Sequence, residues 1–347
     1  MGAENNAMLS YLDDDKRFAD LFNQLYFKGR QVVDAEELAE ASEVYHGKPG
    51  EKGNQRTRDI KRRLKSGKEL KILAVESQSD VNYIMPWRVM DYDCREYGKQ
   101  IRGAQRANRE LARQGKRVYA KDGERLSEVR KEERFAPVYT LCLYHGAEDW
   151  DGPRSLKDMM DFGEDSQGRG DEEAWRDCFA DYPMRLVCAN ELADCSGFRT
   201  SLRELFAILF CRRDKERLKE LLDRESAYQN MDEETAQTLG VLMGIKGFAQ
   251  NSKRYRTEKG EYDMCQAIRE MVEDSRMAGK AEGIAEGEAR GKAAGKAEGK
   301  VEGSAGQIIE IIENIMKELQ CSLEKACKVA GKTVSEYRQS EQICGKV

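Results

Sequence analysis

One apolar run ends in Glu76, Ser77 and Gln78, and two of these side chains could join Asp59 in binding a divalent cation. The run, residues 71–78, reads KILAVESQ and has the length of a buried strand. Side chains alternate between the two faces of a strand, so Glu76 and Gln78 share a face, roughly 6–7 Å apart. A hairpin with a second strand, 56–62, would bring Asp59 beside Glu76. Such oxygens bind Mg²⁺, which orients a phosphate and lowers the pKa of bound water.

The spacing of Asp59, Glu76 and Gln78 alone would also fit an ordinary hairpin with polar residues on its solvated face. The longer sequence around them is more specific evidence of a family. Glu76-Ser77-Gln78 is followed by Tyr83, Met85-Pro86, Arg88, Met90, Tyr92-Asp93 and Tyr97. Over roughly residues 15–200 the chain resembles the recombination-promoting nuclease (Rpn) / putative transposase family of the PD-(D/E)XK nuclease superfamily. The resemblance implies an α/β, restriction-endonuclease-like fold, with a mixed sheet flanked by helices and an all-helical C-terminal region.

The resemblance also implies roles for individual residues. Asp59 and Glu76 correspond to the metal-binding acids, with Mg²⁺ as cofactor, and Gln78 stands at the third catalytic position, where the superfamily usually has lysine. Glutamine has no charge and no titratable proton, so it can orient an attacking water but cannot replace lysine electrostatically. Lys61 and Lys71 are two candidate sources of the missing charge, and the sequence does not choose between them.

Superfamily nucleases often place a polar residue of the first helix near the metal. A helix is predicted over 13–28, where apolar residues recur at three- and four-residue spacing. Asp20 and Asn23 are its candidates for that role. A solvated helix face explains both residues equally well.

Basic residues are concentrated where DNA contacts are expected. Residues 48–71 hold ten Lys or Arg against three acids, whereas residues 148–177 hold eleven acids against four bases, so the net charge of −5 conceals a separation. In the helix predicted from Pro86 onward, arginines recur on one face, which favours contact with phosphates, although a solvated face has the same pattern. The predicted DNA-binding residues are Arg58, Arg62, Arg88, Arg102, Arg106, Arg109 and Arg113.

The cysteine and histidine content disfavours other chemistries. Ten cysteines are scattered without CxxC spacing, and there are only two histidines, His46 and His145. Zinc sites and histidine-based nucleophile triads are therefore disfavoured. No apolar run approaches the ~20 residues of a membrane span, and the N-terminus lacks the pattern of a secretory signal. We expect buried free thiols, no membrane contact and a reducing cytoplasm.

The distribution of strand and helix signals predicts the domain organisation. Strand signals occur at about 56–62, 70–78, 136–144 and 184–190, and helix signals prevail from Ser201 onward. A short helix is also expected at 34–45. The predicted parts are a nuclease-like domain at 1–200, a helical appendage at 201–274, a low-complexity segment at 275–304 and a helical tail at 305–347.

The low-complexity segment carries glycine at every fourth position from Gly279 to Gly303. Each glycine costs a helix about 1 kcal/mol relative to alanine. The segment is therefore either a frayed spacer or a helix that a partner stabilises. In the second case the chain could form a homo-oligomer through its C-terminal tail. Residues 307–319 form a strongly amphipathic pattern, and Ser322 and Thr333 are placed to cap two short helices.

The leading hypothesis is a metal-dependent DNA endonuclease that hydrolyses phosphodiester bonds, associated through the resemblance with recombination or mobile elements. One alternative is a non-catalytic DNA-binding or transposition-accessory protein, in which the basic segments bind the DNA backbone. Another is an interaction protein whose tail assembles partners. Metal-dependent cleavage separates the first from the other two.

Overall fold

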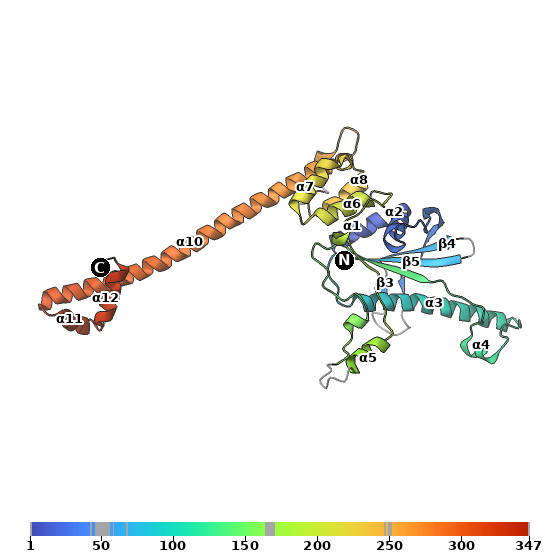
Figure 1. Ribbon diagram of the computed structural model, residues 1–347, viewed down its shortest axis with the longest axis horizontal. Coiled ribbons are helices and arrows are strands. Elements are labelled where there is room, and N and C mark those ends of the chain that lie inside the picture. The colour runs from blue at the N-terminus through green and yellow to red at the C-terminus, as the bar shows by residue number, and fades with distance from the viewer. Residues whose placement is uncertain are drawn as a thin grey trace. The chain divides into compact units, whose positions relative to one another are not determined.

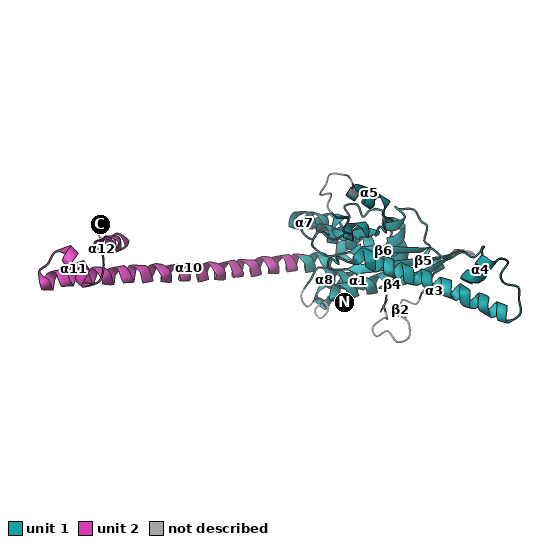
Figure 2. Cartoon of the chain, turned by 90° about the horizontal axis from the view of Figure 1, so that it is seen from below, with its two compact units in different colours: residues 1–268 teal, residues 269–347 magenta. Residues whose placement is uncertain are grey.

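The computed structural model describes residues 2–41, 44–45, 56–57, 59–66, 69–163, 171–245, 248 and 252–345. The chain divides into two compact units, residues 1–268 and 269–347 (Figure 2). The first unit joins the predicted nuclease-like domain to the predicted appendage: the hydroxyl of Tyr11 lies 2.8 Å from Ser201 Oγ and 2.9 Å from Thr235 Oγ1. The two segments therefore share one core.

A five-stranded mixed sheet lies at the centre of the first unit, as the α/β prediction requires. In sheet order its strands are β1 (Leu38–Glu40), β4 (Ile60–Ser66), β5 (Glu69–Gln78), β6 (Val138–Tyr144) and β7 (Leu186–Cys188). The pairs β1–β4 and β4–β5 are antiparallel, whereas β5–β6 and β6–β7 are parallel. A separate two-stranded ladder joins β2 (Val44–Tyr45) to β3 (Arg56–Thr57).

The helix predicted at 34–45 is wrong. Asp34 caps a single 3-10 turn (Ala35–Glu37) by accepting a hydrogen bond from the Glu36 N–H at 3.0 Å. The chain then extends into β1, which pairs with residues 62–64 of β4. Pairing with an existing strand satisfies the backbone of this short segment, so tertiary contact overrides its helical composition.

Helix α3 (Met85–Arg113) crosses one face of the sheet and connects the parallel strands β5 and β6, with the short helix α4 (Asp122–Ser127) following it (Figure 1). Pro86 stands in its first turn, as predicted, because the missing N–H of proline is not needed there. Met85 and Val89 of α3 pack in one buried cluster with Cys142 and Tyr144 of β6. This packing holds the first turns of α3 against the ends of the central strands.

Helices cover the opposite face of the sheet (Figure 1). They are α1 (Ala3–Leu12), α2 (Asp15–Leu21) with a following π-helical turn (Phe22–Tyr26), α6 (Leu202–Cys211), α7 (Lys215–Arg224) and α8 (Glu233–Leu242); α5 (Asp171–Cys178) lies apart from them. The predicted helix 13–28 is thus only part of an α1–α2 pair. Asp14 separates the two helices, since its side chain caps α2 by accepting from the Arg17 N–H at 2.9 Å.

The second unit is built on the long helix α10 (Met264–Leu319), which contains the whole glycine repeat. Helices α11 (Leu323–Val329) and α12 (Val334–Ile343) pack on its last turns around Ile309, Ile312 and Tyr337. Thr333 caps α12 as predicted, accepting from the Glu336 N–H at 3.2 Å. Across the described ranges, no helix combines the length and the apolar character that crossing a bilayer requires.

Two glycines of the first unit should respond in opposite ways to alanine. A Cβ on Gly146 would lie 2.3 Å from the backbone oxygen of Ser79, whereas a Cβ on Gly103, within α3, meets nothing within 4 Å. We expect Gly146→Ala to lower the free energy of unfolding by roughly 1–3 kcal/mol through overpacking. Gly103→Ala should raise it by about 1 kcal/mol. Urea unfolding measures both, and equal effects would contradict the described packing around Gly146.

Candidate functional site

The structure brings the two predicted acids together at the end of the central hairpin. Asp59 directly precedes β4, and the register that pairs Ile60 with Val75 sets Asp59 level with Glu76 on β5. The backbone N–H of Ser77 donates to Asp59 Oδ2 at 2.8 Å, which fixes the orientation of this carboxylate. The antiparallel hairpin therefore delivers both carboxylates to one face of the sheet.

A cation from α3 lies between these carboxylates. Arg88 Nη2 is 3.5 Å from Glu76 Oε2 and 4.0 Å from Asp59 Oδ1. Arg88 was predicted to contact DNA, and its place beside the two acids was not predicted. The signal that was available is the start of α3 at Met85, which places Arg88 in the first helical turn, directly after the β5 strand.

The three side chains differ in their exposure. The Asp59 side chain is 2% exposed and that of Glu76 is fully buried, whereas 24% of the Arg88 side chain is exposed. Asp59 Oδ1 has no hydrogen-bond partner among the described residues. A buried carboxylate oxygen without a donor is costly, and a cation relieves that cost.

Burial and charge oppose each other at this site. Burial raises the pKa of Asp59, while the Ser77 N–H and the Arg88 guanidinium act to lower it, and the net direction is upward. For Arg88, burial acts to lower the pKa, but Glu76 first, and then Tyr92 and Asp59, outweigh it and the net direction is upward. Arg88 therefore stays charged, and Asp59 holds its proton to higher pH than an exposed aspartate.

Gln78 shares the face of Glu76, two residues further along β5, as strand alternation predicts. Its side chain is largely buried, and its Nε2 donates to the backbone oxygen of Ser77 at 2.7 Å. The amide is thus oriented by the strand itself. An oriented neutral amide can position a water by hydrogen bonding.

The two lysines considered as substitutes for the superfamily lysine lie elsewhere. Lys61 is buried on the same face as Asp59, but its Nζ pairs with Glu96 Oε2 of α3 at 3.0 Å. Lys71 lies near the start of β5, five residues before Glu76 and so about 17 Å away along the strand. Arg88 is therefore the cation that the structure sets beside the acids.

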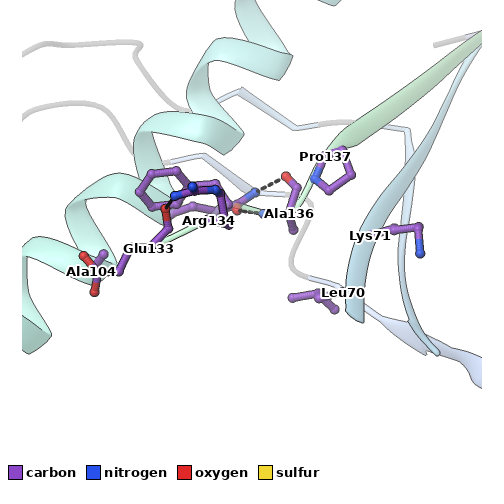
Figure 3. Close-up of a pocket in the computed structure, with 9 residues that line it drawn as sticks. Leu70, Lys71, Ala104, Glu133, Arg134, Ala136 and Pro137 are labelled. Carbon is purple, nitrogen blue, oxygen red and sulfur yellow. Dashed lines mark hydrogen bonds between the residues drawn. The ribbon is translucent and has the colours of Figure 1, made fainter. Parts of the chain in front are cut away.

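Figure 3 shows the surface pocket at that distant end of β5, which has a volume of about 570 Å³. Leu70, Lys71, Arg134 and Pro137 contribute to its lining. Gln100 of α3 fixes the neighbouring loop, because its side chain accepts from the Ala136 N–H at 2.7 Å and donates to the Ala136 oxygen at 3.2 Å. This pocket is separate from the carboxylates.

Asp20 and Asn23, the candidates from the first helix, accept hydrogen bonds from backbone N–H groups of nearby loops. Asp20 Oδ2 accepts from the N–H groups of Arg199 and Thr200, at 2.9 and 2.8 Å, and from the Thr200 hydroxyl. Asn23 Oδ1 accepts from the N–H groups of Val32 and Val33, both at 2.8 Å. Both side chains hold loops in place, which corrects their suggested role near a metal.

Arg62 is also corrected. It points to the face opposite Asp59 and is 4% exposed, with its guanidinium 2.5 Å from Asp13 Oδ1 and 2.9 Å from Asp15 Oδ1. A buried arginine that binds two acids at the α1–α2 junction is not presented to DNA. Arg58 lies outside the described residues.

The remaining arginines lie on the exposed half of α3. Arg102, Arg106, Arg109 and Arg113 are all exposed. Arg109 pairs with Glu128 at 2.5 Å, and Arg113 approaches Glu110 at 3.8 Å. These arginines lie on the helix well beyond the turn that carries Arg88, so any phosphate contact they make is at a distance from the acids.

A buried polar cluster that the sequence did not reveal lies behind Ser77. His145 Nε2 is 3.0 Å from Ser77 Oγ and 2.9 Å from Asn5 Oδ1, and the histidine is fully buried. Burial, with a smaller contribution from Arg212, lowers the pKa of His145 to about 4. Because Ser77 carries the N–H that holds Asp59, this cluster supports the candidate site from the other face of the sheet.

Protonation of His145 should make the fold sensitive to acid. Its folded pKa of about 4 lies below the ordinary 6.5, so the unfolded chain takes up this proton at higher pH. Stability is therefore lost as the pH falls from about 6.5 towards about 4, by about 3 kcal/mol in total. Urea unfolding of the wild type and of His145→Gln between these pH values should show this slope only in the wild type. Parallel curves would contradict a neutral buried histidine.

Within the described part of the chain, no cluster of three or more His, Cys, Asp or Glu side chains is arranged to hold a metal ion. Comparisons with protein-family models, with curated proteins and with solved structures give no match for this chain.

Proposed function

We propose that this protein is a Mg²⁺-dependent endonuclease that hydrolyses phosphodiester bonds of DNA. The observation that supports this proposal is the convergence of Asp59 and Glu76 on one guanidinium at the end of the β4–β5 hairpin, with both carboxylates buried. Two buried carboxylates beside a single cation form an oxygen-rich position that a divalent ion can share.

The residues fit such an ion, although they form only part of its ligand sphere. Asp59 Oδ1 is buried without a hydrogen bond, and Glu76 lies level with it. Mg²⁺ usually takes one or two carboxylates from a protein and keeps several waters, so a third acidic ligand is not required. When bound, Mg²⁺ would supply Lewis-acid polarisation of the phosphate and a water of lowered pKa.

The chain's own residues would then have distinct tasks. Asp59 and Glu76 hold the ion, and the Ser77 N–H keeps Asp59 oriented. Arg88, of which 24% of the side chain is exposed, would stabilise the negative charge that develops on the phosphate. Gln78 orients the attacking water. Because the pKa of Asp59 is raised, ion binding weakens on acidification sooner than it would at an exposed aspartate.

The same residues carry the resemblance to the Rpn family. The central hairpin of the mixed sheet presents the two acids, and α3 begins at Met85-Pro86 and carries Arg88 in its first turn. This arrangement supports placing residues 1–200 among restriction-endonuclease-like folds. A role in recombination or in mobile elements is part of this proposal.

A second candidate function is DNA binding without cleavage. The observation that favours it is the position of Arg88, whose charge already neutralises Asp59 and Glu76. The three side chains can then be a structural ion-pair network that binds no metal. In that case the exposed arginines of α3 would bind the DNA backbone and no metal would be needed.

Conversion of supercoiled plasmid to nicked and linear forms separates the two candidates. The nuclease proposal expects conversion with Mg²⁺ or Mn²⁺ and none with excess EDTA. Binding that shifts the plasmid in a gel without any cleavage in either metal would refute the nuclease and support the second candidate.

The exposed arginines of α3 should bind DNA through phosphates under either candidate. We expect Arg102→Gln, Arg106→Gln and Arg113→Gln together to reduce the slope of log K against log salt by about 2–3, since each phosphate contact contributes about 0.9. Fluorescence anisotropy at several salt concentrations measures the slope. Changing three exposed arginines of the α7 region, Arg213, Arg217 and Arg224, is the matched control. Equal slopes in both triple variants would mean that the α3 arginines lie on a solvated face and make no phosphate contacts.

A further inference from the structure

Helix α10 carries four distinct lines of side chains along its exposed stretch. Every residue from 273 to 304 is exposed. The first line is the glycine line, Gly279 to Gly303 at every fourth position, and the second is the alanine line, two residues after each glycine, which is alanine except for Val301. Successive members of a line are turned by about 40°, because four residues make 400° of a helix with 3.6 residues per turn.

The two remaining lines are charged and opposite in sign. The acidic line holds the residue before each glycine: Ala278, Glu282, Glu286, Arg290, Ala294, Glu298 and Glu302. The basic line holds the residue after each glycine: Lys280, Ile284, Glu288, Lys292, Lys296, Lys300 and Ser304. Four glutamates against one arginine give the acidic line a net charge of −3, and four lysines against one glutamate give the basic line +3. They flank the glycine line on its two sides.

The glycine line is open along its whole length. A Cβ added to any glycine from Gly279 to Gly303 meets no atom within 4 Å. The alanine line differs at its C-terminal end, because Val301 and Ala305 line a groove with Ser340 and Ile343 of α12. The glycine line is therefore the face that can receive another helix closely.

We propose that α10 pairs with α10 of a second copy of this chain, in parallel, glycine line against glycine line. In a parallel two-fold pair, the acidic line of each helix borders the basic line of the other. In an antiparallel two-fold pair, acidic borders acidic and basic borders basic. The net charges of −3 and +3 therefore select the parallel arrangement.

The individual neighbours in a parallel, in-register pair agree with the totals. A residue on the acidic line of one copy then lies beside the basic-line residues two positions before and after it in the other copy. The opposite-charge neighbours are Glu282 with Lys280, Arg290 with Glu288, Glu298 with both Lys296 and Lys300, and Glu302 with Lys300. The like-charge neighbours are Glu286 with Glu288 and Arg290 with Lys292. Attraction outnumbers repulsion, and each contact occurs twice because the pair is two-fold symmetric.

A second copy fits this face better than an unrelated partner does. A two-fold interface must be complementary to itself, and a helix that carries opposite charges on the two flanks of one smooth line meets that condition in parallel. Glycine also lets two backbones approach closely, which gives packing contacts in place of those missing from the lone helix. A repeat of four residues exceeds 3.6 per turn, so the pair would wind with a right-handed supercoil.

Charge-reversal variants of the full chain test the pairing. One variant reverses the acidic line, Glu282→Lys, Glu286→Lys and Glu298→Lys, and the other reverses the basic line, Lys280→Glu, Lys292→Glu and Lys296→Glu. Sedimentation velocity in the micromolar range should show a dimer for the wild type, at least a tenfold weaker dimer for each variant alone, and a restored dimer when the two variants are mixed.

The matched control places three lysines elsewhere, with Glu173→Lys, Glu216→Lys and Glu220→Lys on exposed positions of the first unit. It should dimerise like the wild type. A monomeric wild type, variants that dimerise alone as well as the wild type does, or a control that dissociates would overturn the proposal.

Photo-crosslinking shows whether the two α10 helices are parallel or antiparallel. p-Benzoylphenylalanine at position 278, on the acidic line, should attach within residues 276–284 of the second copy, as peptide mass spectrometry of the crosslinked dimer will show. An antiparallel pairing of the two glycine lines sets Gly279 opposite Gly303, so position 278 would then lie near residue 304. Attachment within residues 300–308 would mean an antiparallel pair and would overturn the parallel arrangement.

Discussion

Glu76→Gln and Asp59→Asn are each expected to slow Mg²⁺-dependent plasmid nicking by at least about a hundredfold. Each change keeps the size of the side chain and removes the negative charge that would hold the ion. A neutral amide oxygen is a weaker ligand for Mg²⁺ than a carboxylate is. Timed agarose-gel assays at saturating Mg²⁺ measure the rate, and DNA affinity should change little because phosphates are bound by arginines elsewhere.

Asp80→Asn is the matched control for both variants. Asp80 follows the end of the same strand, but it is exposed and its carboxylate accepts from the Ser79 hydroxyl. Its removal should leave the nicking rate unchanged. Wild-type nicking by either Glu76→Gln or Asp59→Asn would remove the assigned residue from the site.

Lys61→Met is expected to lower the free energy of unfolding by about 3–5 kcal/mol, the largest stability effect predicted for this chain. Lys61 is 1% exposed and Glu96 7%, so the substitution leaves the Glu96 carboxylate buried without its lysine. Lys61→Met combined with Glu96→Leu should recover most of the loss, because the pair is then replaced by apolar groups. Urea unfolding measures both changes.

Lys65→Met is the control, because Lys65 lies on the same strand and is exposed. It should change the free energy of unfolding by less than about 0.5 kcal/mol. If Lys61→Met were equally mild, the ion pair between β4 and α3 would contribute nothing to stability, and the described packing of α3 on the sheet would be in error.

Local patterns predicted the hairpin but not the environment of its side chains. Strand alternation and a turn signal were enough to bring Asp59 to Glu76. They could not show that Lys61 would be buried against α3, since Glu96 is 35 residues away in the sequence. Arg62 was misassigned for the same reason: a basic cluster looks solvent-exposed until the acids that bind it, Asp13 and Asp15, arrive from a distant helix junction.

Arg88 shows a different limit of the sequence. Its helix and its place near the start of that helix were predicted, but its target was not, because the direction of a helical side chain depends on how the helix crosses the sheet. His145 was not predicted at all. It follows β6, and only the parallel pairing of β6 with β5 reveals that it lies under Ser77. Both residues become visible only through contacts between distant strands and helices.

Binding of Mn²⁺ to the purified protein tests the central claim most directly, because it asks whether Asp59 and Glu76 hold a metal without requiring turnover. Electron paramagnetic resonance reports free Mn²⁺ during a titration at neutral pH. We predict a saturable site in the wild type that is lost in Asp59→Asn and in Glu76→Gln and kept in Asp80→Asn. A wild type that takes up no Mn²⁺ with or without DNA, or acid variants that bind it as the wild type does, would contradict the proposed site.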